Sequence, residues 1–298
     1  MWRIRLIFAP MKNLREERLM GLVYALSLTW LLHWLAQTAV ARTFSYLGRP
    51  ELSNFFAGGE PTGPAVFDHV RASIAAVQIF AFGLTGAAFL WAYFGRGALK
   101  TAFVDKISFR HWIIAVLVVV ASQPMIQWTV LNPETFSLPW PQWESDLERV
   151  EARNFKLLEG LLPNRLALNL LVIALLPAIM EEAFFRGFVL KTLQTVSGVH
   201  AAVWISALLF SALHFQAFGF VGRTLLGAIF GYVTMLSGGS LWPAISAHFV
   251  NNAAFVVAAY FWGLSEVNRD AHWVAAAISA IAVVGLLLYW KARLYKAE

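Results

Sequence analysis

Eight long apolar runs are the feature that most constrains how this chain folds. They cover residues 20–41, 72–95, 111–132, 165–194, 199–215, 221–236, 241–263 and 272–291. Most of them hold about 20 residues, the length of helix that crosses the hydrocarbon core of a bilayer. A backbone surrounded by lipid must satisfy its own hydrogen bonds, so runs of this kind form helices.

The composition agrees with this interpretation. Hydrophobic residues make up 59% of the 298-residue chain and charged residues only 13%, whereas soluble domains average about 25% charged residues. The chain has no cysteine, which excludes disulfides, thiolate metal sites and cysteine nucleophiles. We therefore predict an all-α integral membrane protein, with about eight transmembrane helices that enclose a polar cavity and with membrane lipid as a partner.

The distribution of basic residues predicts the topology. The net charge is +6, but the Lys and Arg residues lie mostly at the ends of apolar runs, so we expect no nucleic-acid partner. More of them fall on the side shared by both termini, which predicts a multi-pass protein with cytoplasmic termini. We expect the membrane to be a bacterial or archaeal cell membrane. The initial stretch MWRIRLIFAPMKNLREER is too charged for a signal peptide and predicts an amphipathic segment on the membrane surface.

Three further segments carry structural expectations. The fifth and sixth runs are short and contain polar groups, so we expect other helices to enclose them. Gly227 and Gly231 fit a small-xxx-small helix contact. The long loop 133–164 contains an amphipathic helical stretch from about residue 144, whose acidic residues we expect on a solvated face: Glu144, Asp146, Glu148 and Glu151.

Ionisable and amide side chains inside the apolar runs are the main functional signal. A charged residue at the centre of a membrane helix costs about 2.5–3.5 kcal/mol on insertion scales, and such residues usually face the bundle interior and mark functional sites. Here they gather in the C-terminal half of the chain, on the fourth, fifth and seventh runs: Glu181, Glu182, Arg186, His214, His248 and Asn252.

Helical spacing separates the two glutamates. Glu182 and Arg186 are four residues apart, so they share a helix face and can pair. Glu181 lies about 100° around the helix, which leaves it free. Pro177 removes a backbone donor and should loosen the helix below the two glutamates. Folding back at the next turn places Glu181 and His214 at similar heights.

These residue types predict a water-activating amide hydrolase. A carboxylate beside a neutral imidazole can orient a water molecule and take its proton, and a second imidazole with an amide can donate to the resulting oxyanion. The residues alone leave alternatives open. Glu181, His214 and His248 also form an acceptable zinc set, although no HExxH occurs. Buried charges could equally serve a transporter or a protein that binds without catalysis.

Three short motifs carry a resemblance to a known family. EEAFFR at 181–186 fits EExxxR, FSALH at 210–214 fits FxxxH, and HFVNN at 248–252 fits HxxxN. In this order they resemble the CAAX-protease and bacteriocin-processing (CPBP) family, which includes the Rce1-type intramembrane glutamic proteases and the Abi proteins. The resemblance covers about residues 165–260, with no departure at the motif positions.

The resemblance implies specific roles. It implies that Glu181 and His214 activate the water, that His248 and Asn252 form the oxyanion hole, and that Glu182 and Arg186 support the site without a metal or other cofactor. The implied substrate is a prenylated or otherwise membrane-anchored protein or peptide, although some members of the family act as immunity or scaffold proteins.

The resemblance also suggests how the chain is divided. Residues 1–160 would hold the amphipathic start and the first three transmembrane helices. Residues 161–298 would hold the catalytic core and the last helix. With no internal repeat and no linker, we expect both parts to form one continuous membrane domain.

Overall fold

The computed structural model describes residues 14–103, 107–132, 141–214, 216–217, 219–267 and 272–294. Helices account for most of these residues, and no strand occurs in the described ranges, which confirms the predicted all-α class. Most of the predicted amphipathic start, residues 1–13, lies outside them.

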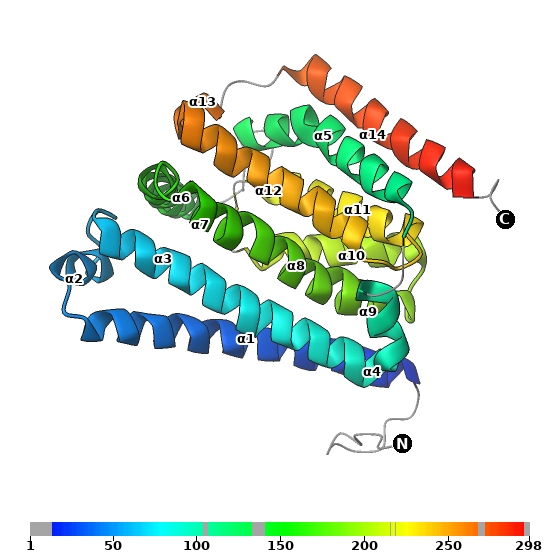
Figure 1. Ribbon diagram of the computed structural model, residues 1–298, viewed down its shortest axis with the longest axis horizontal. Coiled ribbons are helices and arrows are strands. Elements are labelled where there is room, and N and C mark those ends of the chain that lie inside the picture. Colours follow the sequence, from blue (N-terminus) through cyan, green and yellow to red (C-terminus); the bar gives the residue numbers. More distant parts are fainter. Residues whose placement is uncertain are drawn as a thin grey trace.

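The helices run back and forth along one bundle (Figure 1). All eight predicted runs coincide with helical segments, and α1 begins at the same end of the bundle at which α14 finishes, as the predicted topology requires. The elements in chain order are α1 (Leu14–Tyr46), α2 (Pro50–Phe56), α3 (Pro64–Ala76), η1 (Val77–Leu84), α4 (Thr85–Phe103), α5 (Phe109–Leu131), α6 (Pro141–Leu161), α7 (Leu166–Asn169), η3 (Leu170–Leu175), α8 (Leu176–Glu182), η4 (Ala183–Leu190), α9 (Lys191–Gln194), α10 (Val199–Ala212), α11 (Phe220–Leu236), α12 (Trp242–Trp262), α13 (Leu264–Val267) and α14 (Trp273–Leu294).

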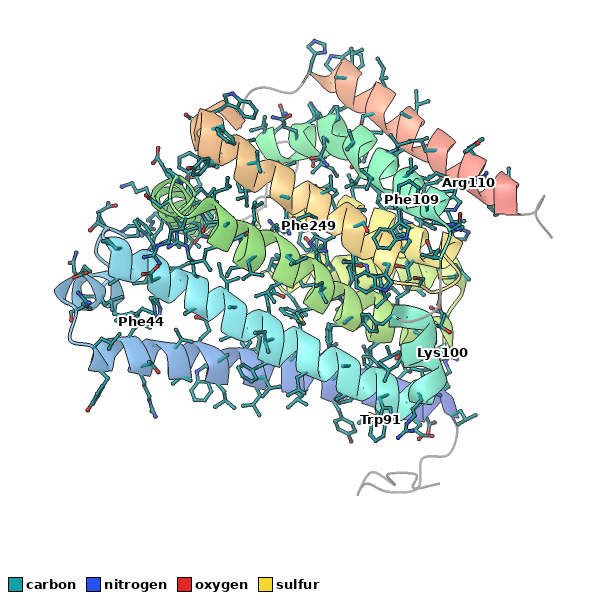
Figure 2. The ribbon with its side chains drawn as sticks, viewed as in Figure 1. Phe44, Trp91, Lys100, Phe109, Arg110 and Phe249 are labelled. Carbon is teal, nitrogen blue, oxygen red and sulfur yellow. The ribbon has the colours of Figure 1, made fainter. Side chains whose placement is uncertain are left out.

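Six continuous helical stretches of the described chain are long and apolar enough to span a bilayer. Large apolar side chains cover the outer faces of the bundle, including Trp34 on α1 and Ile281 on α14, and Trp91 projects outward from α4 (Figure 2). Lipid-facing helices require such surfaces. The stretches are Leu14–Tyr46, Pro64–Phe103, Phe109–Leu131, Leu166–Gln194, Trp242–Trp262 and Trp273–Ala292.

The two short apolar helices, α10 and α11, differ in burial. Most of α11 is buried, as predicted. The same prediction is wrong for α10, which packs on one side only and exposes Trp204, Ile205 and Leu208 on the other. Apolar side chains can pack against lipid as well as against protein. Hydrophobicity alone therefore does not distinguish an enclosed helix from one at the edge of the bundle.

The predicted small-residue contact joins α10 to α11. A Cβ atom added to Gly227 would lie 3.0 Å from Cα of Ala207, and one added to Gly231 would lie 3.0 Å from Cγ1 of Val203. Both distances are shorter than ordinary van der Waals contact, so the two glycines allow the helices to approach closely.

The fourth span is not a uniform α-helix. Pro177 lies in the first turn of α8, directly after the π-helical η3, and a second π-helical stretch, η4, follows Glu182. The π geometry accommodates the missing backbone donor of Pro177 without a break. The loosening predicted at Pro177 is therefore present as a change between π-helical and α-helical hydrogen bonding.

α8 lies in the middle of the bundle, between α3–α4 on one side and α12 on the other (Figure 1). At the crossing with α4, a Cβ atom added to Gly86 would lie 2.7 Å from the backbone nitrogen of Phe184 and 2.8 Å from its Cα. The two backbones therefore touch at Gly86. This contact sets how closely the second span approaches the helix that carries the glutamates.

α6 lies across one end of the bundle and is seen nearly end-on in Figure 1. The buried guanidinium of Arg71 fixes the turn after α6, since its Nη2 donates to the carbonyl oxygens of Leu161 at 3.0 Å and Asn164 at 3.2 Å. Its Nε donates to Oδ1 of Asn169 at 2.8 Å. One side chain from α3 thus ties the surface helix to the start of the fourth span.

One acidic residue of α6 does not lie on a solvated face. Glu148 is exposed as predicted, but Glu151 is half-buried, so the prediction is wrong there. Burial raises the pKa of the Glu151 carboxyl, and the nearby Arg223 guanidinium opposes this rise. Glu151 faces the bundle because α6 packs over its end rather than standing free in water.

Candidate active site

Two adjacent glutamates at the end of α8 form the centre of the site. Glu181 is 4% exposed and Glu182 is 0% exposed. Oε1 of Glu182 accepts a hydrogen bond from Nη1 of Arg186 at 2.9 Å and another from Nδ1 of His248 at 2.9 Å. The predicted Glu182–Arg186 pair is thus confirmed, and His248 is a partner that the spacing did not predict.

The side chain of Arg186 is buried among the described residues. Its Nη2 donates to the carbonyl oxygen of Gly227 at 2.8 Å. The guanidinium carbon lies 4.7 Å from the ring centre of Phe210 and 5.3 Å from that of Phe230. Charged hydrogen bonds and cation–π contacts together offset the desolvation cost of a buried guanidinium.

Glu181 has different partners. Its Oε1 accepts a hydrogen bond from Nε2 of Gln78 at 2.7 Å. Its Oε2 has no hydrogen-bond partner in the described part of the chain and lies 3.9 Å from Nε2 of His248. Oε1 of Glu182 thus accepts two hydrogen bonds, whereas its Oε2, like that of Glu181, has no partner among the described residues. Glu181 differs in that it does not bond to Arg186, as the helical spacing predicted, and that its free oxygen lies near Nε2 of His248.

Gln78 was missed by the sequence analysis. It lies in η1, in the second span, a region in which no motif was found. The available signal was a single amide inside the apolar run AAVQIFAFGL, because an isolated amide in a membrane helix usually faces a polar partner. Nothing in the sequence identified Glu181 as that partner.

His248 lies on α12 with its ring held between aromatic residues and carboxylates. The ring stacks on Phe230, with centroids 4.8 Å apart and an interplanar angle of 15°. An ionised carboxylate can only accept, so Nδ1 carries the proton that it shares with Glu182. Nε2 is consequently the nitrogen that faces Glu181.

His214 lies in the turn after α10 rather than within the helix predicted for the fifth run, because α10 ends at Ala212. Its Nδ1 is 2.8 Å from the carbonyl oxygen of Phe210. A carbonyl oxygen only accepts, so Nδ1 carries a proton and Nε2 of the neutral ring is left as an acceptor.

Phe210 connects the two histidines. Its ring centroid lies 5.0 Å from that of His214 and 6.0 Å from that of His248. The aromatic residue of the FxxxH motif therefore packs against both imidazoles.

The Asn252 amide is held by a backbone carbonyl and by a chain of neighbouring amides. Its Nδ2 donates to the carbonyl oxygen of Ile173, in η3, at 3.3 Å. Its Oδ1 accepts from Nδ2 of Asn251 at 3.0 Å, and Oδ1 of Asn251 accepts from Nε2 of Gln123 on α5 at 3.1 Å. Residues from three spans thus orient the Asn252 amide.

The six predicted site residues are linked to different degrees. Glu182, Arg186 and His248 are connected by hydrogen bonds, Glu181 lies beside His248, and the rings of His214 and His248 both pack against Phe210. Asn252, one turn after His248 on α12, bonds to Ile173 of the span that carries the glutamates. Among the described residues, no group of three His, Asp or Glu side chains is close enough together to hold a metal ion.

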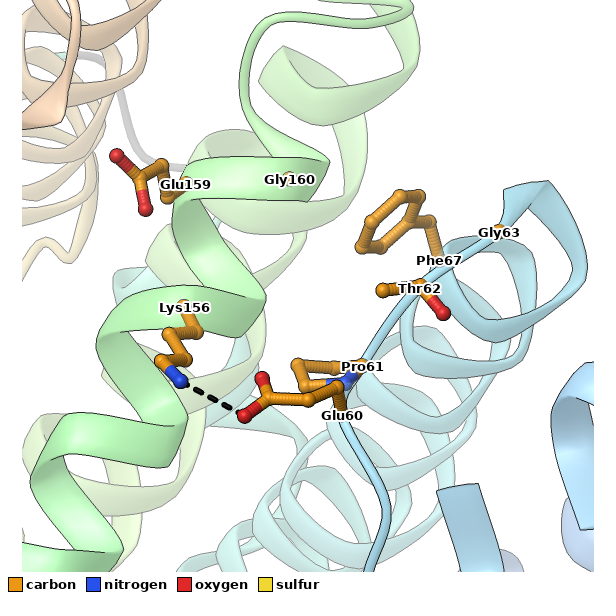
Figure 3. Close-up of a pocket in the computed structure, with 8 residues that line it drawn as sticks. All are labelled: Glu60, Pro61, Thr62, Gly63, Phe67, Lys156, Glu159 and Gly160. Carbon is orange, nitrogen blue, oxygen red and sulfur yellow. Dashed lines mark hydrogen bonds and ion pairs between the residues drawn. The ribbon is translucent and has the colours of Figure 1, made fainter. Parts of the chain in front are cut away.

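Two pockets lie elsewhere. One of about 450 Å³ opens between α6 and the segment that leads into α3, where Nζ of Lys156 lies 2.7 Å from Oε1 of Glu60 (Figure 3). Both side chains of this pair are exposed, and exposed pairs contribute little to stability. An apolar pocket of about 460 Å³ lies between α1 and α3–η1. None of the six predicted site residues lines either pocket.

Comparison with known proteins identifies the part of the chain that holds this site. Residues 163–254 match the family model described as type II CAAX prenyl endopeptidase Rce1-like. This segment contains all six predicted site residues, but neither Gln78 nor Gln123.

Part of the chain is also similar to a bacterial protein. The chain is 32% identical over 110 residues to YpbD, an uncharacterised protein of Bacillus subtilis (strain 168). The similarity covers 35% of this chain. The chain spans about half (51%) of the length of YpbD. No solved structure matches the chain.

Proposed function

Because residues 163–254 form an Rce1-like domain, we propose that the protein is an intramembrane endopeptidase that hydrolyses peptide bonds with an activated water molecule. The observation that carries the proposal is the unpartnered Oε2 of the buried Glu181, 3.9 Å from Nε2 of His248. A buried carboxylate oxygen that no protein group satisfies is suited to bind and deprotonate water.

The first step forms the bond between water and the substrate. Nε2 of His214 accepts a hydrogen bond from the water and orients it, and the Glu181 carboxylate takes its proton. The water oxygen attacks the carbonyl carbon of the scissile peptide bond, and the electron pair of the C=O bond moves to the oxygen. A tetrahedral oxyanion results.

The second step breaks the peptide bond. In the doubly protonated ring, Nδ1 of His248 donates to the Glu182 carboxylate and Nε2 donates to the oxyanion. Asn252 contributes the second hydrogen of its amide, since the first is bound to Ile173. As the intermediate collapses, Glu181 returns its proton to the departing nitrogen, and the C–N bond breaks.

The proposed substrate is a prenylated or otherwise membrane-anchored protein or peptide. The site is built from membrane-spanning helices, so a substrate segment must reach it within or at the surface of the bilayer. The proposed location is a bacterial or archaeal cell membrane, and the excess of basic residues on the side of both termini supports a cytoplasmic placement of those ends.

Mass spectrometry of peptide termini tests the activity. Membranes of cells that produce the wild-type protein should contain new termini, and membranes with Glu181→Gln or His214→Ala should lack them. Asn252→Ala should retain part of the activity. Glu159→Gln is a matched control, because it makes the same chemical change at an exposed carboxylate of α6. Near-wild-type cleavage by Glu181→Gln would refute the role of Glu181.

The same preparations separate the alternatives. A quenched peptide built around a cleavage site found by mass spectrometry should be hydrolysed by the purified protein in the presence of a chelator. Loss of hydrolysis with chelator and recovery with zinc would assign the residues to a zinc-dependent protease instead. A scaffold or immunity protein would keep its cellular phenotype in Glu181→Gln.

A further inference from the structure

We infer that Gln78 is a positioning residue for Glu181, contributed by a part of the chain outside the Rce1-like domain. Nε2 of Gln78 lies 2.7 Å from Oε1 of Glu181, and Gln78 is 7% exposed. The inference rests on the proposed role of Glu181 as the group that takes the proton of the water.

The chemistry of the pair fixes the orientation of the Gln78 amide. An ionised carboxylate has acceptors only, so the amide must turn its NH₂ group toward Glu181. A hydrogen bond from an amide to a carboxylate is charge-assisted and stronger than a neutral one. It engages Oε1, so that the unpartnered Oε2 is the oxygen directed toward Nε2 of His248.

Gln78 has no other apparent reason to be polar. Its neighbours in η1 are apolar, and its own Oε1 has no hydrogen-bond partner among the described residues. Burying an amide is costly when its hydrogen bonds are lost. In the described part of the chain, the hydrogen bond to Glu181 offsets this cost, whereas a leucine or methionine would serve packing alone.

The fold places Gln78 accurately. Gly86, two turns further along the same helical stretch, brings the backbone into contact with that of Phe184, which follows Glu181 by three residues. The ring of Phe82 packs against Phe184 and Phe185, with centroids 5.7 and 5.8 Å apart. The amide donor is therefore held on a rigid element, as precise orientation of a reacting group requires.

Kinetics of Gln78→Met test the positioning role. Methionine has a similar length but cannot donate. With the quenched peptide as probe, we expect kcat to fall about 10- to 100-fold while KM stays close to the wild-type value, because the water-activating oxygen is misplaced and the substrate surface is unchanged. Thr85→Val is the control: its hydroxyl, on the same helical stretch, is buried and has no hydrogen-bond partner within the described ranges. This control should match wild type.

A double-mutant cycle in thermal unfolding tests the contact without any need for activity. Gln78→Met should lower the Tm of the wild-type protein but not that of Glu181→Met, in which the acceptor is already absent. Additive effects would show that the two side chains do not interact and would overturn the inference.

The two readouts distinguish the possible failures. Coupling in the Tm together with an unchanged kcat would make Gln78 a packing residue only and would also overturn the inference. If the wild-type protein hydrolyses no peptide, the proposed function fails and the positioning role fails with it, whereas coupling in the Tm would still establish the Gln78–Glu181 contact.

Discussion

Adding a single methyl group at Gly86 should force apart the two helices that bring Gln78 to Glu181. The added Cβ would lie 2.7 Å from the backbone nitrogen of Phe184 and 2.9 Å from the carbonyl carbon of Ala183, whereas ordinary contact begins at 3.4 Å. The opposing atoms belong to the backbone, so no side chain can rotate away. The helices must therefore separate by several tenths of an ångström.

The expected cost is that of an overpacked core. Such insertions typically destabilise a protein by about 1–3 kcal/mol. Alanine is also the better helix former, by about 1 kcal/mol, and this gain would mask part of the cost. Gly285→Ala supplies the correction, because Gly285 lies within α14 and an added Cβ would meet nothing within 4 Å.

Thermal unfolding of both variants in the same detergent measures the difference. We expect Gly285→Ala to be as stable as wild type or more stable, and Gly86→Ala to be less stable than Gly285→Ala by about 1–3 kcal/mol. The kcat for the quenched peptide should fall in Gly86→Ala and not in Gly285→Ala. Equal stability of the two variants would refute the close approach of α4 and η4.

Other buried contacts make separate predictions. Arg186→Met leaves Glu182 buried without its cation, so the free energy of unfolding should fall by about 3–5 kcal/mol; a loss below 1 kcal/mol would contradict a desolvated pair. Arg71→Leu frees the turn after α6, so hydrogen exchange in that turn should rise while kcat is kept, and unchanged exchange would argue against the tie. Asn251→Leu interrupts the amide chain to Asn252 and should lower kcat about 2- to 10-fold; an unchanged kcat would show that Asn252 needs no such support.

The sequence was most informative about features that are determined within a single helix. Apolar run length located the spans because the requirement for internal backbone hydrogen bonds acts on each helix separately. Spacing of four residues paired Glu182 with Arg186, and spacing of one residue separated Glu181 from that pair. The four-residue spacing of Gly227 and Gly231 likewise predicted a close helix contact, because it places both glycines on one face of the helix.

Contacts between distant spans were not predictable in this way. Gln78 and Glu181 are 103 positions apart, so their contact depends on which helices are neighbours in the bundle. The amide chain from Gln123 to Asn252 has the same origin. His214 was placed inside a helix because the apolar run continues past Ala212, and hydrophobicity carries no stop signal there.

The hydrogen bond from Gln78 affects how this protein can be cut into pieces or recombined. The sequence similarity begins at residue 163, but the cluster of site residues is not built from the matched segment alone. The amide of Gln78, which is essential to the geometry of the cluster, belongs to the part of the chain before residue 163. A chimera that grafts residues 163–254 onto foreign helices would inherit the carboxyl group without its amide donor. Exchange of modules between relatives should therefore succeed only when the second span travels with the graft.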